Sequence, residues 1–155
     1  MEPEIVTLDA FTVMGVLESF PSSDPAFYDT MWLVRFPQYE ERVRPFSPDR
    51  AYYGVYYHDP DGRPIHYLAG MKVENATEIP EGLVVRPVSA ARYVAIQAPV
   101  KGIAAAAEYL FGEWLPASPY EYAAPLCDLE IYPPETENPD SPVWVYVPIR
   151  EKVAT

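Results

Sequence analysis

The stretch GLVVRPVSAARYVAIQAP (residues 82–99) opens the second half of the chain and points to the fold, because the segments after it repeat the order of the first half. Its apolar residues predict an opening strand. The segment IAAAAEYLFGEWLP (103–116) then predicts a strong helix. CDLEIYPP (127–134) and PVWVYVPI (142–149) predict a closing hairpin across a polar connection. The second half is therefore a strand, helix, strand, strand unit.

The first half has the same order of elements. EIVTLDAFTVMGVLES (4–19) predicts the opening strand, and SSDPAFYDTMWLVRFP (22–37) predicts the helix. AYYGVYYH (51–58) and IHYLAGMKV (65–73) predict the two closing strands. The segment DPDGRP (59–64) between them has the Asp, Pro and Gly residues typical of a chain reversal.

The two predicted helices have recognisable ends. Asp24 is a plausible N-cap, and Pro25 suits the first helical position. Pro37 is expected to end the first helix and Pro116 the second, because proline cannot continue the hydrogen-bond ladder. The apolar stripes predicted to face the core are Phe27, Met31 and Val34 in the first helix, and Ile103, Ala107, Leu110, Phe111 and Trp114 in the second.

Nearly constant offsets relate the two halves. They are 79 positions from Val6 to Val85, 82 from Trp32 to Trp114, and 76 from Val73 to Ile149. One such unit leaves an apolar sheet face uncovered, whereas two units can share a sheet and a core. We therefore predict one α+β domain over residues 1–155, with repeats at approximately 4–75 and 83–150. Its antiparallel sheet carries helices on one side and a ligand groove between the halves.

Composition narrows the possible partners. The chain has 155 residues, 49% of them hydrophobic, and a formal charge of −12. Direct nucleic-acid binding needs a basic surface, so this charge argues against it, and it also disfavours anionic membranes. A negative field attracts organic cations, although acidity also serves solubility alone. No apolar run is long enough to span a membrane, and the single cysteine and the absence of a signal peptide favour the cytoplasm.

The usual catalytic and cofactor motifs are absent from the sequence. It contains no nucleophile elbow, phosphate-binding loop, dinucleotide fingerprint or zinc-protease motif, so we expect no cofactor. His58 and His66 flank the predicted reversal, where a metal site is conceivable but exposed turn residues are the better interpretation. Cys127 has no neighbours that would stabilise a thiolate and is expected to be a buried apolar residue. We therefore predict no metal site.

Aromatic residues are the positive signal, with 13 tyrosines and 3 tryptophans. Core packing is the ordinary role of any one of them, but the set exceeds what a small core needs. Aromatic faces with one carboxylate form a good cage for a planar or cationic organic ligand. The candidate ligand-binding aromatics are Trp32, Tyr56, Tyr67, Trp114, Tyr120 and Tyr146.

Glu130 lies in the middle of an apolar strand, where it shares a face with Tyr132. If Val55 matches Leu129, its mate in the first half is Tyr56. Three interpretations are open: a solvated sheet face, an ion pair with Arg35 or Arg92, or the polar focus of an aromatic pocket. In the last case burial should raise the pKa of Glu130 unless a cation is present.

The chain resembles the gyrase-inhibitor-like small-molecule-binding family, whose module is also the effector-binding domain of multidrug-responsive bacterial transcription regulators. The resemblance covers roughly residues 4–150 and rests on the order of several motifs. The motifs that carry it are YYGVYYHDPDG, HYLAGMKV, IPEGLVVRPVSAARYVAIQAPVKG, WLPASPYEYA, DLEIYPP and VWVYVPI.

The resemblance implies that Glu130 is the acidic residue that receives lipophilic cations among aromatic rings. The leading hypothesis is thus a standalone cytoplasmic protein that binds bulky lipophilic or cationic aromatic compounds. Some family members hydrolyse cyclopropane-containing toxins, which implies a second hypothesis with Glu130 as the catalytic general base. A third is protein–protein regulation of DNA gyrase. Monomer and dimer are both compatible with the internal repeat.

Two segments depart from the family pattern. Ser118-Pro119-Tyr120-Glu121 stands where the family usually has Ser-Gly-Tyr-Glu, so this turn is stiffer and the direction of Tyr120 is altered. The segment FPQYEERVRPFSPDR (36–50) has no counterpart in the second half. We expect it to be a lid or an edge of the groove.

Overall fold

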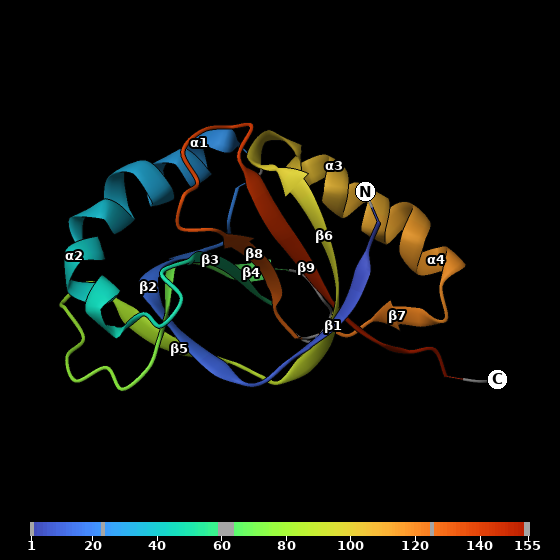
Figure 1. Ribbon diagram of the computed structural model, residues 1–155, viewed down its shortest axis with the longest axis horizontal. Coiled ribbons are helices and arrows are strands. Elements are labelled where there is room, and N and C mark those ends of the chain that lie inside the picture. Colours follow the sequence, from blue (N-terminus) through green and yellow to red (C-terminus); the bar gives the residue numbers. More distant parts are fainter. Residues whose placement is uncertain (1, 23, 59–63, 125, 154–155) are drawn as a thin grey trace.

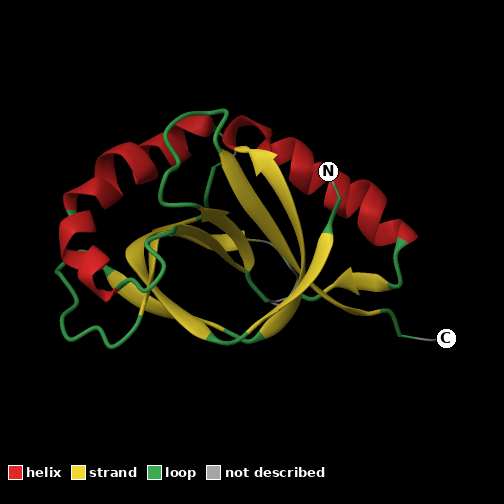
Figure 2. Cartoon of the chain, viewed as in Figure 1, coloured by secondary structure: helices red, strands yellow, loops and turns green. Residues whose placement is uncertain are grey.

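The computed structural model describes residues 2–22, 24–58, 64–124 and 126–153. Within these ranges nine strands form one antiparallel sheet. Figures 1 and 2 show the helices on one side of this sheet. The strands are β1 (Glu4–Leu8), β2 (Phe11–Ser19), β3 (Tyr52–His58), β4 (Pro64–Val73), β5 (Val84–Val88), β6 (Ala91–Pro99), β7 (Tyr120–Tyr122), β8 (Asp128–Tyr132) and β9 (Pro142–Glu151). The predicted α+β class and the predicted helices on one side of the sheet are confirmed.

The strand order shows the internal repeat directly. It runs β1-β6-β9-β8-β3-β4-β2-β5, with β7 paired to β9, so β2-β4-β3 of the first half meets β8-β9-β6 of the second at a central β3–β8 pair. The predicted closing hairpin is present as β8 and β9. The predicted reversal at 59–64 lies almost wholly outside the described residues.

Register fixes the offset between the halves more closely than sequence comparison does. Gly54 pairs with Ala69 in the first half, and Glu130 pairs with Val145 in the second, each 76 positions further on. The pseudo-symmetric mate of Glu130 is therefore Gly54, and the expectation of Tyr56 was wrong by two residues. Gly54 and Glu130 also face each other across the β3–β8 pair, which places them at the seam between the halves.

Each predicted opening strand is in fact two strands, and one strand of each half is exchanged. β1 of the first half pairs with β6 of the second, while β5 of the second half pairs with β2 of the first. Phe11 and Ala91 begin β2 and β6, 80 positions apart, and Glu4 and Val84 begin β1 and β5 with the same spacing. This exchange ties the two halves into one sheet.

The first helical arm is longer than predicted. Asp24 caps it through its Oδ1, which accepts from the Ala26 backbone N–H, and Pro25 is the first helical residue as expected. Pro37 does not end it, because helical turns continue to Phe46. The segments are α1 (Pro25–Asp29), the π-helix η1 (Thr30–Arg35), η2 (Phe36–Gln38), α2 (Glu40–Val43) and η3 (Arg44–Phe46). The segment at 36–50 is thus largely this helical continuation.

The second arm has the same π-helical interruption. Its segments are η4 (Val100–Gly102), α3 (Ile103–Tyr109), η5 (Leu110–Trp114) and α4 (Leu115–Ala117). Because a π turn shifts the buried face, both predicted stripes are partly wrong. Val34 and Phe111 are exposed, while Phe36 and Leu115 are buried.

The described residues form three apolar clusters around the sheet. One lies between the first helical arm and the sheet around Met31, Phe36 and Tyr67. Another lies between the second arm and the sheet around Leu110 and Val145. The third contains strand and loop residues such as Tyr53 and fills the opposite face of the curved sheet. Figure 1 shows the two helical arms over opposite ends of the sheet, so the central β3–β8 pair lies between them.

Candidate functional site

Glu130 lies at the centre of β8, between β3 and β9, on the face of the sheet that carries the helices. Strand alternation puts Tyr132 on the same face and turns Leu129 and Ile131 into the opposite cluster. Only 6% of Glu130 is exposed, and among the described residues it is the one buried carboxylate. The solvated-surface interpretation is therefore wrong.

Three tyrosine hydroxyls surround the carboxylate. Tyr132 donates to Oε1 at 2.8 Å, and Tyr67 donates to the same oxygen at 3.2 Å. The Tyr56 hydroxyl lies 3.4 Å from Oε2. Tyr56 and Tyr132 are 76 positions apart, so the repeat supplies one tyrosine from each half at equivalent places.

A second layer of aromatic groups comes from the first helical arm. The Trp32 indole Nε1 donates to the Tyr67 hydroxyl at 2.9 Å. The Tyr28 and Tyr56 hydroxyls are 2.9 Å apart. The Trp32 ring lies 5.4 Å from the Tyr132 ring, and Tyr28 lies 5.1 Å from Tyr67, measured between ring centroids. The arm thus covers the carboxylate with rings whose polar edges point into its hydrogen-bond network.

Gly54 makes room for this network. A Cβ atom at this position would lie 2.4 Å from the Tyr67 hydroxyl and 2.9 Å from Glu130 Oε1. Any side chain would therefore push the hydroxyl and the carboxylate apart. The repeat has a glycine on one strand and a glutamate on the other because only one of two facing positions can hold a large group.

The electrostatic setting of Glu130 is dominated by burial. Burial raises the pKa of the carboxyl group, while the hydrogen bonds from Tyr132, Tyr67 and Tyr56 oppose the shift and the charge of Asp128 adds to it. Across the described ranges no ion pair involves Glu130. The ion-pair interpretation is wrong, because Arg35 pairs with Glu18 and Arg92 approaches Glu151.

The tyrosines of this site are poor acids. Burial, followed by the nearby Glu130 carboxylate, raises the pKa values of Tyr56, Tyr67 and Tyr132 well above the ordinary value. Their hydroxyl groups therefore keep their protons and serve as donors. The site thus combines one carboxylate, neutral hydroxyl donors and aromatic faces.

A separate polar cluster adjoins the site on the same face. The Tyr122 hydroxyl donates to Asp128 Oδ1 at 2.9 Å and lies 3.0 Å from His58 Nε2, which is 3.2 Å from Asp128 Oδ2. The His58 side chain is 3% exposed, so the expectation of an exposed turn residue was wrong for it. His66 is partly exposed, and its Nδ1 lies 3.0 Å from the Ser19 hydroxyl.

Of the candidate aromatics, Trp32, Tyr56 and Tyr67 converge on Glu130 and three do not. Trp114 and Tyr120 stack on each other, with ring planes 7° apart, and pack against the second-arm cluster. Tyr146 pairs with Leu129 and packs beside Tyr93 on the opposite face of the sheet. These three residues lie outside the contacts that form the Glu130 site.

Three members of the site were not among the residues predicted from the sequence. Tyr132 was predicted to share the strand face of Glu130 but was not included among the ligand-binding aromatics. Gly54 follows from a repeat offset of 76. Tyr28 lies four residues before Trp32 on the predicted helix, so helical spacing indicated a shared face.

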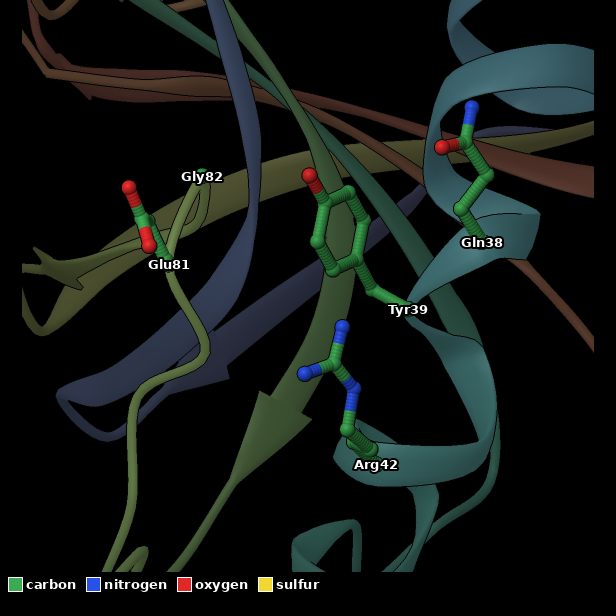
Figure 3. Close-up of a pocket in the computed structure, with 5 residues that line it drawn as sticks. All are labelled: Gln38, Tyr39, Arg42, Glu81 and Gly82. Atoms are coloured by element: carbon green, nitrogen blue, oxygen red, sulfur yellow. The ribbon is translucent and has the colours of Figure 1, made fainter.

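Other features of the described chain hold no comparable constellation. No group of three or more His, Cys, Asp and Glu side chains there is arranged to hold a metal ion. Cys127 is buried, and burial raises the pKa of its thiol to about 12. A surface pocket of about 570 Å³ lies apart from Glu130, between α2 and the segment before β5. Figure 3 shows Arg42 beside the Tyr39 ring there. The guanidinium carbon of Arg42 lies 5.3 Å from the centroid of that ring.

Comparison with known proteins agrees with this fold. The model of the GyrI-like small molecule binding domain matches residues 1–150. The transcriptional regulator BrlR of Pseudomonas aeruginosa is 29% identical over 154 residues, which are 96% of this chain and 56% of BrlR. The chain thus spans about half the length of this curated relative.

Two solved structures share the fold at low sequence identity. SAV2435 bound to tetraphenylphosphonium has a TM-score of 0.72 at 14% identity, covering 97% of this chain and 94% of SAV2435. The C-terminal domain of EcmrR has a TM-score of 0.71 at 15% identity, covering 97% and 98%. The matching family model defines the class, a domain that binds small molecules, and the chain belongs to the GyrI-like small-molecule-binding domain family.

Proposed function

We propose that this protein binds bulky lipophilic cations that carry aromatic groups, with Glu130 as the counter-charge. The observation that carries this proposal is a buried carboxylate that has hydroxyl donors but, in the described chain, no ion-pair partner. Such a group is costly to ionise unless a cation arrives with it. Tyr28, Trp32 and Tyr132 supply rings that attract the same cation.

Two further observations support a cation over other ligands. The net charge of −12 raises the local concentration of cations around the protein. SAV2435, which shares the fold, was solved with tetraphenylphosphonium, a cation of this class.

The test is a titration with tetraphenylphosphonium followed by tryptophan fluorescence, because Trp32 lies beside the site. Glu130→Gln should weaken binding by about tenfold or more, since the cation loses a buried counter-charge. Glu113→Gln removes the same charge from an exposed helical position and should leave binding nearly unchanged. Equal affinity of the wild type and Glu130→Gln would contradict the role of the carboxylate.

Hydrolysis of a reactive small molecule is the second candidate. It is favoured by the raised pKa of Glu130, since a carboxylate with a higher pKa is a stronger general base near neutral pH. Glu130 would remove a proton from a water molecule while Tyr67 or Tyr132 donates to the substrate. This hypothesis requires that the protein turns over an electrophile and that Glu130→Gln abolishes the turnover while the fold is retained. If the compound binds but is not turned over, hydrolysis is contradicted and only the binding proposal remains.

The setting of this activity is also a proposal. We propose that the domain acts in the cytoplasm and can work without an attached DNA-binding region. Among the described helices none is long and apolar enough to cross a membrane. DNA gyrase is a proposed protein partner whose binding, through the acidic surface, would weaken with salt and would not depend on Glu130.

A further inference from the structure

The hydrogen-bond network around Glu130 has a limited number of protons to share. A phenol hydroxyl has one proton to donate. The Tyr56 oxygen has two neighbours, the Tyr28 hydroxyl at 2.9 Å and Glu130 Oε2 at 3.4 Å. If Tyr56 donates to Tyr28 across the shorter distance, a proton on Oε2 is needed to bridge the longer one. With that direction of the Tyr56–Tyr28 bond, the network accommodates a proton on Glu130 Oε2 in the unliganded protein.

The other carboxylate oxygen is consistent with this assignment. Oε1 accepts from Tyr132 at 2.8 Å and from Tyr67 at 3.2 Å, so it acts as an acceptor alone. Tyr67 is itself kept in place by the Trp32 indole, which donates to its oxygen at 2.9 Å. A carboxylic acid with Oε1 as acceptor and Oε2–H as donor thus satisfies both carboxyl oxygens and the Tyr56 hydroxyl.

We propose that a bound cation and a proton compete for Glu130, so that each lipophilic cation entering the site releases one proton. This inference rests on the proposed function of the same site. The neutral acid gives up the proton on Oε2, the O–H bond breaks, and its electron pair stays on the carboxylate beside the cation. The proton leaves to water, so the buried site is neutral before and after binding: first as the uncharged acid, then as a carboxylate paired with the cation.

The hydroxyl chain offers a path for this proton. Tyr56 accepts it from Oε2 and passes its own proton to Tyr28, and the half-buried Tyr28 releases its original proton to water. After the transfer the chain has the opposite direction, with Tyr28 donating to Tyr56 and Tyr56 donating to the ionised Oε2. The same atoms therefore satisfy the acid and the carboxylate without moving.

The charges around Glu130 favour the exchange. The groups that face it are the tyrosines of α1, β3, β4 and β8, which stay neutral, and Asp128 on its own strand. Asp128 carries a negative charge that favours the protonated acid, and His58 lies against Asp128 at 3.2 Å. Val145 of β9 is the apolar neighbour on the other side. Burial, the largest effect, also favours the neutral acid in the absence of a cation.

The experiment is calorimetric titration of the whole protein with tetraphenylphosphonium, in buffers of different ionisation enthalpy and over a series of pH values. The wild type should release about one proton per cation at pH values below the pKa of Glu130 in the folded protein. Over that range the dissociation constant should fall by about tenfold per pH unit, and it should become constant above this pKa.

Two variants keep the test decisive. Glu130→Gln should bind more weakly, with no proton release attributable to this site and no pH dependence of this kind. Tyr132→Phe keeps the ring but removes the donor at 2.8 Å, so the pH midpoint of cation binding should move upward. A downward or absent shift would contradict the assignment of Tyr132 as a donor to the ionised form.

The outcomes separate this inference from the proposed function. Binding of tetraphenylphosphonium without proton release, and with a dissociation constant independent of pH from about the ordinary glutamate value of 4.5 upward, overturns the exchange but leaves the cation site standing. Absence of any binding contradicts the cation site itself. Proton release that persists unchanged in Glu130→Gln assigns the proton to another group and overturns the exchange.

Discussion

At Glu130, burial and hydroxyl donors act on the carboxyl group in opposite directions. Burial raises its pKa, and the donors Tyr132, Tyr67 and Tyr56 lower it, with burial the larger effect. The folded protein therefore binds this proton more tightly than the unfolded chain does. Proton linkage then gives the direction in which the free energy of unfolding changes with pH. The stability that comes from the neutral acid is fully present at low pH. It is lost as pH rises from the ordinary glutamate pKa through the pKa of Glu130 in the folded protein.

This sign gives a stability prediction for the unliganded protein. Relative to Glu130→Gln, whose amide stays neutral, the wild type should lose free energy of unfolding as pH rises above about 4.5 and then level off. Urea denaturation of both proteins at a series of pH values measures the difference. The exposed variant Glu113→Gln should show no such divergence from the wild type. Parallel curves for the wild type and Glu130→Gln would mean that the folded-state pKa of Glu130 is not raised.

Glu130 could be singled out from the sequence, but the residues around it could be predicted only in part. An acidic residue in the middle of an apolar strand stands out, and strand alternation puts Tyr132 beside it. Tyr56 and Tyr67 were identified from their crowding on two strands. Trp114, Tyr120 and Tyr146 carried the same aromatic signal yet lie elsewhere, because composition indicates residue types and leaves undetermined which face of the sheet each occupies.

At the scale of elements, the paired strands β3 and β8 set the geometry of the site. Gly54 on β3 and Glu130 on β8 are directly opposite, and the glycine leaves the space that the Tyr67 hydroxyl and Oε1 share. The π turns η1 and η5 interrupt the two helical arms in equivalent places. The sequence pattern did not predict these turns, because a regular helical period cannot represent an inserted residue, so the buried stripes shifted.

Gly54 therefore offers a test of the seam. Gly54→Ala should destabilise the fold by about 1–3 kcal/mol, because its Cβ overpacks against the Tyr67 hydroxyl and the carboxylate. The same variant should weaken cation binding, since it displaces both groups. The matched control is Gly112→Ala, whose Cβ meets nothing within 4 Å and should be neutral or stabilise the helix by up to about 1 kcal/mol. Urea denaturation and a tetraphenylphosphonium titration of both variants measure these effects. Equal free energies of unfolding for the two variants would mean that a Cβ atom at Gly54 fits without collision, which would contradict the close packing against Tyr67 and Glu130.

At the scale of the whole molecule, a repeated unit has produced an asymmetric site. Sequence offsets predicted the duplication and the α+β class, since the order of apolar runs and helix signals recurs in both halves. They did not predict that β1 and β5 exchange between the halves, because strand pairing depends on contacts distant in sequence. The exchange binds the halves into one sheet, and the pseudo-symmetric tyrosines Tyr56 and Tyr132 then meet around a single carboxylate.

The proposed cation site depends on Glu130 as the counter-charge for an aromatic cation. A crystal structure of the protein with tetraphenylphosphonium is the decisive measurement. We predict the cation beside the Glu130 carboxylate and in contact with Trp32 and Tyr132, with the Trp32–Tyr67 contact opened to admit it and the Tyr28–Tyr56 contact retained. A cation seated elsewhere, with Glu130 still covered and its hydrogen bonds unchanged, would contradict this role of Glu130.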